Sequence, residues 1–190
     1  HHRVKNNLQT VSALLRLQSR RSSEDAVKVA LAEAERRVQA IATVHAALSQ
    51  NVDESVDFDE VARTILRMAG AIASTDHGVE VITTGTFGTI SADQAQALAT
   101  VLNELVANSV EHGLADRDGR IEVNAQRKGL SMTVTVADDG VGFVPGTPMT
   151  GLGTQIVQQM VRGELRGSIE WAPREGGGTL VTLLINLDAA

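Results

Sequence analysis

Apolar residues recur with helical spacing in the N-terminal part of this 190-residue chain. Over residues 3–21 they form a stripe at Val4, Leu8, Val11 and Leu15, which Leu14 and Leu17 widen. A second stripe has the alternating four-three spacing of a coiled-coil seam, at Val27, Leu31, Ala34, Val38, Ile41, His45 and Leu48. Between the stripes, Ser23 precedes two acidic residues and is expected to cap the second helix. The pattern predicts an antiparallel helical hairpin, which needs a second copy to cover both stripes in a four-helix bundle.

After residue 52 the pattern alternates between helical and extended segments. Helices are expected at 58–74, 92–112 and 153–163. Strands are expected at 79–84, 120–126, 131–137, 167–172 and 179–187. Helices gathered on one face of a mixed sheet form an α/β sandwich. We therefore predict an α+β protein with a helical hairpin over 1–52, a linker at 51–55 and a sandwich domain over 53–190.

Charge separates the two predicted domains and limits their functions. Residues 1–52 carry eight Lys/Arg and four Asp/Glu, whereas residues 53–190 carry nine and nineteen. The acidic bulk argues against nucleic-acid binding, and the basic hairpin suits an acidic protein partner or a phosphate. No apolar run approaches the roughly 18 residues of a membrane helix, so no membrane contact is expected. The absence of cysteine excludes disulfides and thiolate metal sites and fits a cytoplasmic location.

The predicted helix at 92–112 carries three polar residues at intervals of four. Glu104, Asn108 and His112 therefore share one helical face. A carboxylate and an amide oxygen one turn apart can hold Mg²⁺ beside the phosphates of a nucleotide. A solvated polar stripe explains the same spacing without any ligand.

Two glycine-rich segments follow predicted strands. The first is Asp-Asp-Gly-Val-Gly at 138–142, where the carboxylate of Asp138 can accept a hydrogen bond from an exocyclic amine such as that of adenine. Its glycines let the backbone pass close to a flat base. The second is Gly-Gly-Gly-Thr at 176–179, where the hydroxyl of Thr179 can help to bind a base. A plain turn accounts for either segment alone.

A third glycine-rich segment opens the predicted helix at 153–163. Gly151 and Gly153 flank Leu152 just before an apolar helical pattern. The free N–H groups of such a helix start bind phosphate. A simple loop-to-helix junction is the alternative explanation.

The order and spacing of these motifs within residues 91–187 closely resemble the N, G1, G2 and G3 boxes of the Bergerat ATP-binding fold. Gyrase-type ATPases, Hsp90 chaperones and histidine kinases share that fold. The resemblance implies ATP and Mg²⁺ as ligands, with Asn108 and Glu104 at the metal and Glu104 also in a catalytic or organising role. It implies that Asp138 binds the adenine amine and that 143–151 forms a short lid. It places the nucleotide among Gly140, Gly142, Gly151, Leu152, Gly153, Thr179 and His112.

The first residues resemble a phosphoacceptor segment. His-His-Arg-Val-Lys-Asn at 1–6 is similar to the corresponding box of the HisKA_2 subfamily of histidine kinases, close to the HWE group. The resemblance implies that His2 is phosphorylated, with His1 as the second choice. Asn6 lies one helical turn after His2 on the same face, so it can position an attacking water or the phosphoryl group. His2 lies about 180° around the helix from Val11, so we expect it to face water.

Together these features predict an ATP-dependent histidine autokinase of a two-component system. It would phosphorylate His2, pass the phosphoryl group to an aspartate of a response-regulator receiver, and form a homodimer through the hairpin. Two alternatives remain open. One is a serine protein kinase of the anti-sigma-factor type, a class that lacks such a hairpin. The other is a degenerate scaffold that binds ATP weakly, because Glu111 stands where many histidine kinases carry Lys.

Overall fold

The computed structural model describes residues 2–28, 30–32, 34–35, 38, 42, 55–73, 78–115, 117–146 and 151–188, with the side chains of 2–6, 68–73 and 152 left out. The chain divides into two compact units, residues 1–52 and 53–190. The predicted linker residues 51–54 and the seam positions Ile41, His45 and Leu48 lie outside the described residues.

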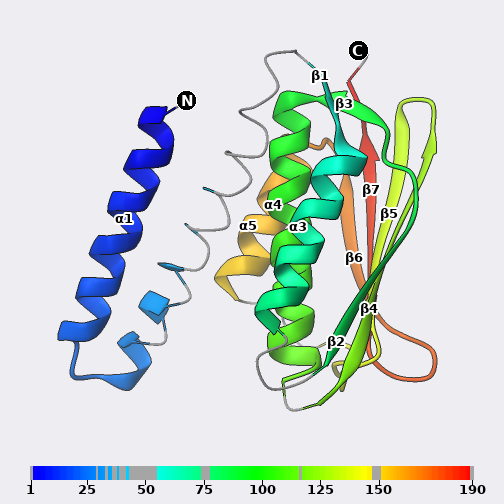
Figure 1. The fold of residues 1–190 in the computed structure, drawn as a ribbon. Coiled ribbons are helices and arrows are strands. Elements are labelled where there is room, and N and C mark those ends of the chain that lie inside the picture. The colour runs from blue at the N-terminus through cyan, green and yellow to red at the C-terminus, as the bar shows by residue number, and fades with distance from the viewer. Residues whose placement is uncertain are drawn as a thin grey trace. The chain divides into compact units, whose positions relative to one another are not determined.

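The first unit begins with α1, His2–Arg21, drawn in blue in Figure 1. This confirms the helix predicted over 3–21. After a turn at 22–24 the chain is helical again from Asp25. Ser19 Oγ donates to the Lys28 carbonyl oxygen at 3.5 Å, and Arg16 Nε donates to Glu35 Oε1 at 2.8 Å. Residues progressively earlier in α1 thus meet residues progressively later in the second segment, as an antiparallel hairpin requires.

The start of the second helical segment differs from the prediction. The Lys28 N–H bonds to the Glu24 carbonyl oxygen at 3.1 Å, so Glu24 occupies the cap position. Ser22 Oγ accepts from the Glu24 N–H at 3.2 Å. The prediction that Ser23 caps this helix is therefore wrong, because the helix begins one residue later and the hydroxyl of Ser22 serves the turn.

The second unit contains eleven elements among its described residues. They are β1 Ser55–Asp57, α3 Phe58–Ala73, β2 Val79–Gly85, β3 Thr89–Ser91, α4 Ala92–Asn108, a π-helical turn Ser109–Gly113, β4 Gly119–Lys128, β5 Ser131–Asp138, α5 Leu152–Arg162, β6 Ser168–Pro173 and β7 Thr179–Asn186. The three helices and the five longer strands confirm the predicted segments.

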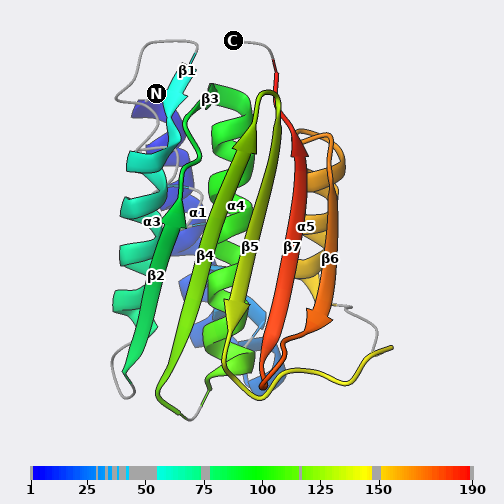
Figure 2. The ribbon, with the colours of Figure 1, turned by 90° about the vertical axis from the view of Figure 1, so that its right-hand side faces the viewer.

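Five strands form one mixed sheet in the order β2-β4-β5-β7-β6. The pair β2–β4 is parallel, and the other neighbouring pairs are antiparallel. Figures 1 and 2 show α3, α4 and α5 covering one face of this sheet, while the other face is left open. The predicted α+β fold with helices on one face is confirmed.

Strict alternation along the strands builds the core between the sheet and the helices. Ile121, Val123 and Ala125 on β4 are buried, while the intervening Glu122 and Asn124 lie on the open face. The helices meet this surface with fully buried residues of α4, among them Leu98, Val101 and Leu102. This layer of apolar side chains fixes the distance of α4 from the sheet and its rotation about its own axis. It thereby fixes the direction of the polar face of α4.

Three elements of this unit were not predicted: β1, β3 and the π-helical turn. The strands β1 and β3 pair with each other in a separate two-stranded sheet, with Ser55 opposite Ser91. Each is only three residues long, too short to show a periodic pattern. The helix predicted over 92–112 is α-helical only to Asn108 and continues as the π-helical turn.

Candidate nucleotide-binding site

The polar face of α4 is positioned by its cap and its core packing. Ser91 Oγ accepts a hydrogen bond from the Gln94 N–H at 3.4 Å and starts the helix. Glu104 is only 6% exposed, whereas Asn108, one turn later on the same face, is half-buried. This face therefore offers a carboxylate and an amide side by side at the C-terminal end of a rigid helix.

The π-helical turn Ser109–Gly113 carries the chain from α4 to the end of β5. The Leu114 N–H bonds to the Ser109 carbonyl oxygen at 2.9 Å, and His112 is exposed while Glu111 is half-buried. The Gly113 carbonyl oxygen accepts from the Val141 N–H at 3.0 Å. The end of α4 and the loop after β5 are thereby brought together, and π-helical turns of this kind are common at functional sites.

Asp138, the last residue of β5, is 2% exposed. Its Oδ1 accepts two backbone hydrogen bonds, from the Gly140 N–H at 3.0 Å and from the Thr179 N–H at 3.1 Å. Within the described residues no donor bonds to Oδ2. One carboxylate oxygen is thus fixed by the protein, and the other can accept from a ligand amine.

Glycines surround Asp138 because backbone segments approach it too closely for any side chain. A Cβ added to Gly140 would lie 2.2 Å from the Gly113 carbonyl oxygen, and one added to Gly178 would lie 2.0 Å from that of Asp138. Gly142 has φ of 67°, a conformation that favours glycine. Backbone packing and conformation within the protein therefore explain why positions 140 and 142 are glycine. The same packing places these backbone segments around Asp138.

The N-terminus of α5 supplies backbone amides that have no partner within the helix. Gly151 is the cap residue, with extended φ and ψ of −61° and 149° and no side-chain cap bond. Its carbonyl oxygen accepts from the Gln155 N–H at 3.1 Å, and Gly153 is buried. The first N–H groups of a helix have no partner within the helix, and they attract phosphate. The side chain of Leu152 is outside the described residues.

The predicted residues fall into two groups. Those of the second unit lie at the C-terminal ends of α4 and β5 and at the starts of α5 and β7 (Figure 2). His2 and Asn6 lie on α1 in the first unit, and their side chains are outside the described residues. Sequence reasoning missed Gly113, whose backbone contacts Gly140, and it named Gly178 as part of a possible turn without its contact with the backbone of Asp138. Only the contact between distant segments reveals their role.

The donor set fits a metal that is shared with a nucleotide. Among the residues that the structure describes, no group of three or more His, Asp or Glu side chains could hold a metal ion alone. Mg²⁺ commonly takes one or two protein oxygens and completes its shell with substrate phosphates and water. Glu104 and Asn108 offer that number of ligands, and the amides at the start of α5 offer a place for the phosphates.

Both units match families of known proteins. Residues 93–189 match the family described as histidine kinase-, DNA gyrase B- and HSP90-like ATPases. Residues 1–72 match HisKA_2, described as histidine kinase. The second unit is thus an ATPase domain of the Bergerat type, and the chain belongs to the family of histidine kinase-, DNA gyrase B- and HSP90-like ATPases. The resemblance to HisKA_2 histidine kinases stated from the sequence is confirmed.

Individual relatives agree with this assignment. The chain is 44% identical over 190 residues to the sensor histidine kinase PdtaS of Mycobacterium tuberculosis, covering 97% of this chain and 38% of that protein. It is 28% identical over 172 residues to a blue-light-activated histidine kinase of Rhizobium johnstonii, covering 89% and 47%. The chain therefore spans less than half the length of either relative.

Solved structures share the fold. The blue-light-activated histidine kinase EL346 of Erythrobacter litoralis superposes with a TM-score of 0.72 at 22% identity, covering 98% of this chain and 58% of that one. Its histidine kinase domain alone gives a TM-score of 0.69 at 20% identity, covering 98% of this chain and 93% of that one.

No helix within the described part of the chain is long and apolar enough to cross a membrane.

Proposed function

We propose that this chain is the kinase core of a two-component sensor, which binds ATP with Mg²⁺ and phosphorylates its own His2. The observation that carries the proposal is the presence, in one chain, of a HisKA_2 segment and an ATPase domain of the histidine kinase type. The buried carboxylate of Asp138, with one oxygen fixed and the other open to a ligand, supports a purine site in that domain.

In the proposed reaction each residue has a separate task. Asp138 Oδ2 accepts the adenine amine, and the amides at the start of α5 bind phosphate oxygens. Glu104 and Asn108 would hold Mg²⁺, which when bound neutralises charge on the transferring phosphates. The unprotonated ring nitrogen of His2 forms a bond to the γ-phosphorus while the bond from that phosphorus to the β–γ bridging oxygen breaks, and ADP leaves.

The phosphohistidine is then consumed by a second transfer. A carboxylate oxygen of an aspartate in a response-regulator receiver attacks the phosphorus, and the phosphorus–nitrogen bond breaks. The exposed Arg20 and Arg21 at the end of α1 give this partner a basic surface. Both partners and ATP meet in the cytoplasm, which is where we place the chain.

The exposed side of α1 supports a homodimer. Ser12 is buried within the hairpin, whereas the apolar side chains of Val11, Leu14 and Leu17 are 42%, 55% and 51% exposed. An apolar stripe of this kind on a helix is stabilised by covering it with a partner. A second copy of the hairpin would bury it in a four-helix bundle.

Labelling with γ-phosphate-labelled ATP tests the proposal. We expect the wild-type chain to incorporate label that is stable to base and lost in acid, and His2→Gln to incorporate none. Asn108→Ala keeps His2 but removes the amide beside the phosphates, so it should also fail to label. Equal labelling of folded His2→Gln would reject His2 as the acceptor, and acid-stable, base-labile label would favour a serine kinase. Weak ATP binding by the wild type, without labelling, would favour the degenerate scaffold.

A further inference from the structure

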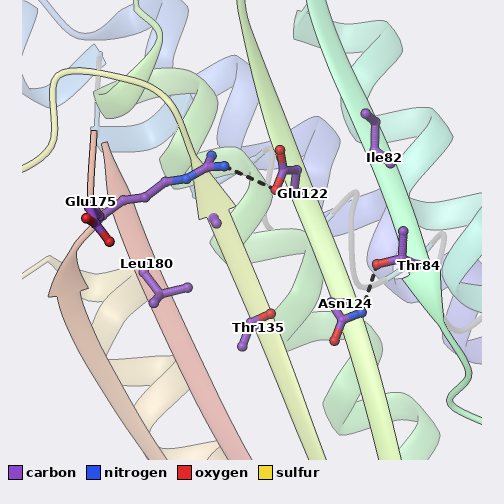
Figure 3. A pocket seen from close by; sticks show the side chains of 9 residues that line it. Ile82, Thr84, Glu122, Asn124, Thr135, Glu175 and Leu180 are labelled. Atoms are coloured by element: carbon purple, nitrogen blue, oxygen red, sulfur yellow. Dashed lines mark hydrogen bonds and ion pairs between the residues drawn. The ribbon is translucent and has the colours of Figure 1, made fainter. Parts of the chain in front are cut away.

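The side chain of Arg174 lies across the open face of the sheet. It follows β6, yet its Nη2 reaches Glu122 Oε2 on β4 at 3.1 Å. Between β6 and β4 lie β7 and β5, where Leu180 and Ala137 are paired opposite each other. These residues line a hollow on the open face, and Figure 3 shows the dashed line at Glu122 that marks the ion pair. Arg174 therefore reaches from the end of the edge strand β6, across β7 and β5, to β4.

The backbone of Arg174 closes the turn that precedes β7. Its N–H bonds to the Gly178 carbonyl oxygen at 3.0 Å, and its carbonyl oxygen accepts from the Gly177 N–H at 3.1 Å. Gly176, Gly177 and Gly178 all have positive φ, at 88°, 109° and 98°. Three successive glycines have no side chains with which to hold a conformation, and they are the most flexible residues of the unfolded chain. The turn 174–178 thus depends on the contacts of its first residue.

The 174–178 turn also lies directly against Asp138, the carboxylate that we propose binds the purine. A Cβ on Gly178 would lie 2.0 Å from the Asp138 carbonyl oxygen, so the two backbones are in direct contact. The next residue, Thr179, donates its N–H to Asp138 Oδ1 at 3.1 Å. The position of the turn therefore decides which oxygen of Asp138 is fixed by the protein and where the other one points.

The ion pair is better suited to positioning than to global stability. The side chains of Arg174 and Glu122 are 27% and 42% exposed, and solvent weakens such pairs. Arg174 Nη1 is buried without a hydrogen-bond partner among the described residues, which further reduces any net gain. Removing the pair should leave the unit folded and act locally on the turn.

We propose that Arg174 is a positioning residue of the nucleotide site, which acts on Asp138 through the 174–178 turn. The pair with Glu122 holds the turn against β5, and the turn holds the Thr179 N–H on Oδ1. Oδ2 is thereby aimed at the base amine. This inference rests on the proposed role of Asp138, and it names a residue on the opposite face of the sheet that tunes purine recognition.

The test compares nucleotide affinity in the full 190-residue chain. ATP and GTP are titrated into wild type, Arg174→Met, Glu122→Gln and Arg174→Lys. At the 6-position adenine presents an amine and guanine a carbonyl oxygen, so of two bases bound in the same orientation only adenine donates to Asp138. We expect Arg174→Met and Glu122→Gln each to weaken ATP binding about threefold to fivefold and to leave weak GTP binding unchanged. Arg174→Lys, which keeps the charge, should retain most of the ATP affinity.

Glu80→Gln is the matched control. Glu80 lies on the same open face and pairs with Arg120 at 3.1 Å, but this pair does not touch the turn. Its variant should bind ATP like wild type, and the thermal unfolding midpoints of Glu80→Gln and Glu122→Gln should agree. Arg174→Met and Glu122→Gln binding ATP like wild type would overturn the inference, as would an equal loss of ATP and GTP binding.

Asp138→Asn separates the inference from the proposed function. This variant should lose more than about tenfold in ATP affinity, because a charged acceptor becomes an amide. If it binds ATP like wild type, the purine site itself is wrong and the inference falls with it. If it binds weakly while Arg174→Met does not, the purine site stands and only the role of Arg174 is rejected.

Discussion

The two units of this chain bury their apolar residues in opposite ways. In the second unit, helices cover one face of a five-stranded sheet, and Leu98 and Leu102 are completely buried. Among the α1 side chains that the structure describes, the buried one is a serine, Ser12, while Leu14 and Leu17 are more than half exposed. The second unit has a closed core, whereas α1 of the first leaves Val11, Leu14 and Leu17 exposed.

The difference assigns a separate task to each unit. A closed core gives α4 and β5 fixed positions, which a nucleotide site needs because its polar groups must converge on one ligand. An uncovered helical stripe suits assembly, since its burial is available as binding energy. In the hairpin, Arg16 donates a hydrogen bond to Glu35 and links the two helical segments. The same carboxylate raises the pKa of the Arg16 guanidinium above its ordinary value.

The largest expected effect is on the free energy of unfolding, when a leucine is replaced by alanine in each unit in turn. Leu98→Ala removes a side chain that is 0% exposed and should lower the free energy of unfolding by about 2–5 kcal/mol. Leu14→Ala removes one that is 55% exposed and should cost less than about 0.5 kcal/mol in a dilute monomer. Far-UV circular dichroism follows the unfolding of both variants, and fluorescence of the single tryptophan, Trp171 on β6, reports the second unit separately. Similar losses from both variants would erase the contrast between the units.

A second comparison asks whether exposure alone marks the dimer surface. Leu17 on α1 is 51% exposed, and Leu184 on β7 is 52% exposed on the open face of the sheet. We expect Leu17→Asp to weaken dimerisation by about tenfold or more, because a charge enters a buried apolar seam. Leu184→Asp should leave it unchanged. Sedimentation velocity over a range of concentrations measures both, and a monomeric wild type would refute the dimer.

The sequence predicted the long elements because their periodicity is local. The stripe of α1, the alternation of Met132, Val134 and Val136 in β5 and the apolar pattern of α4 each extend over enough residues to identify a helix or a strand. The short strands β1 and β3 have no such pattern. Their pairing is decided by the contact of Val56 with its partner Ile90, which is distant in sequence.

The site shows the same limit at the level of single residues. Asp138 was singled out from its place at a strand end, but its two backbone donors come from residues two and 41 positions away. The π-helical turn at Ser109–Gly113 leaves no trace in an apolar pattern, although it brings Gly113 against Gly140. A local pattern does not show how α4, β5 and β7 come together in space. Only the family resemblance predicted that arrangement.

The smallest effect distinguishes local from tertiary support of α4. Ser91→Ala removes the hydroxyl that accepts from Gln94 N–H, and an N-cap of this kind contributes about 1 kcal/mol. We expect the tryptophan-detected unfolding free energy to fall by about that amount, while ATP affinity stays unchanged. The reason is that the other end of α4 is held independently, by core packing of Leu102 and by the contact of Gly113 with the loop after β5. Ser22→Ala, the matching loss of a turn hydroxyl in the first unit, should leave the tryptophan signal unaffected. A fall in ATP affinity on Ser91→Ala would mean that the closed core does not isolate the site from the entry of its helix, and the contrast between the closed core of the second unit and the exposed helix of the first would have to be redrawn.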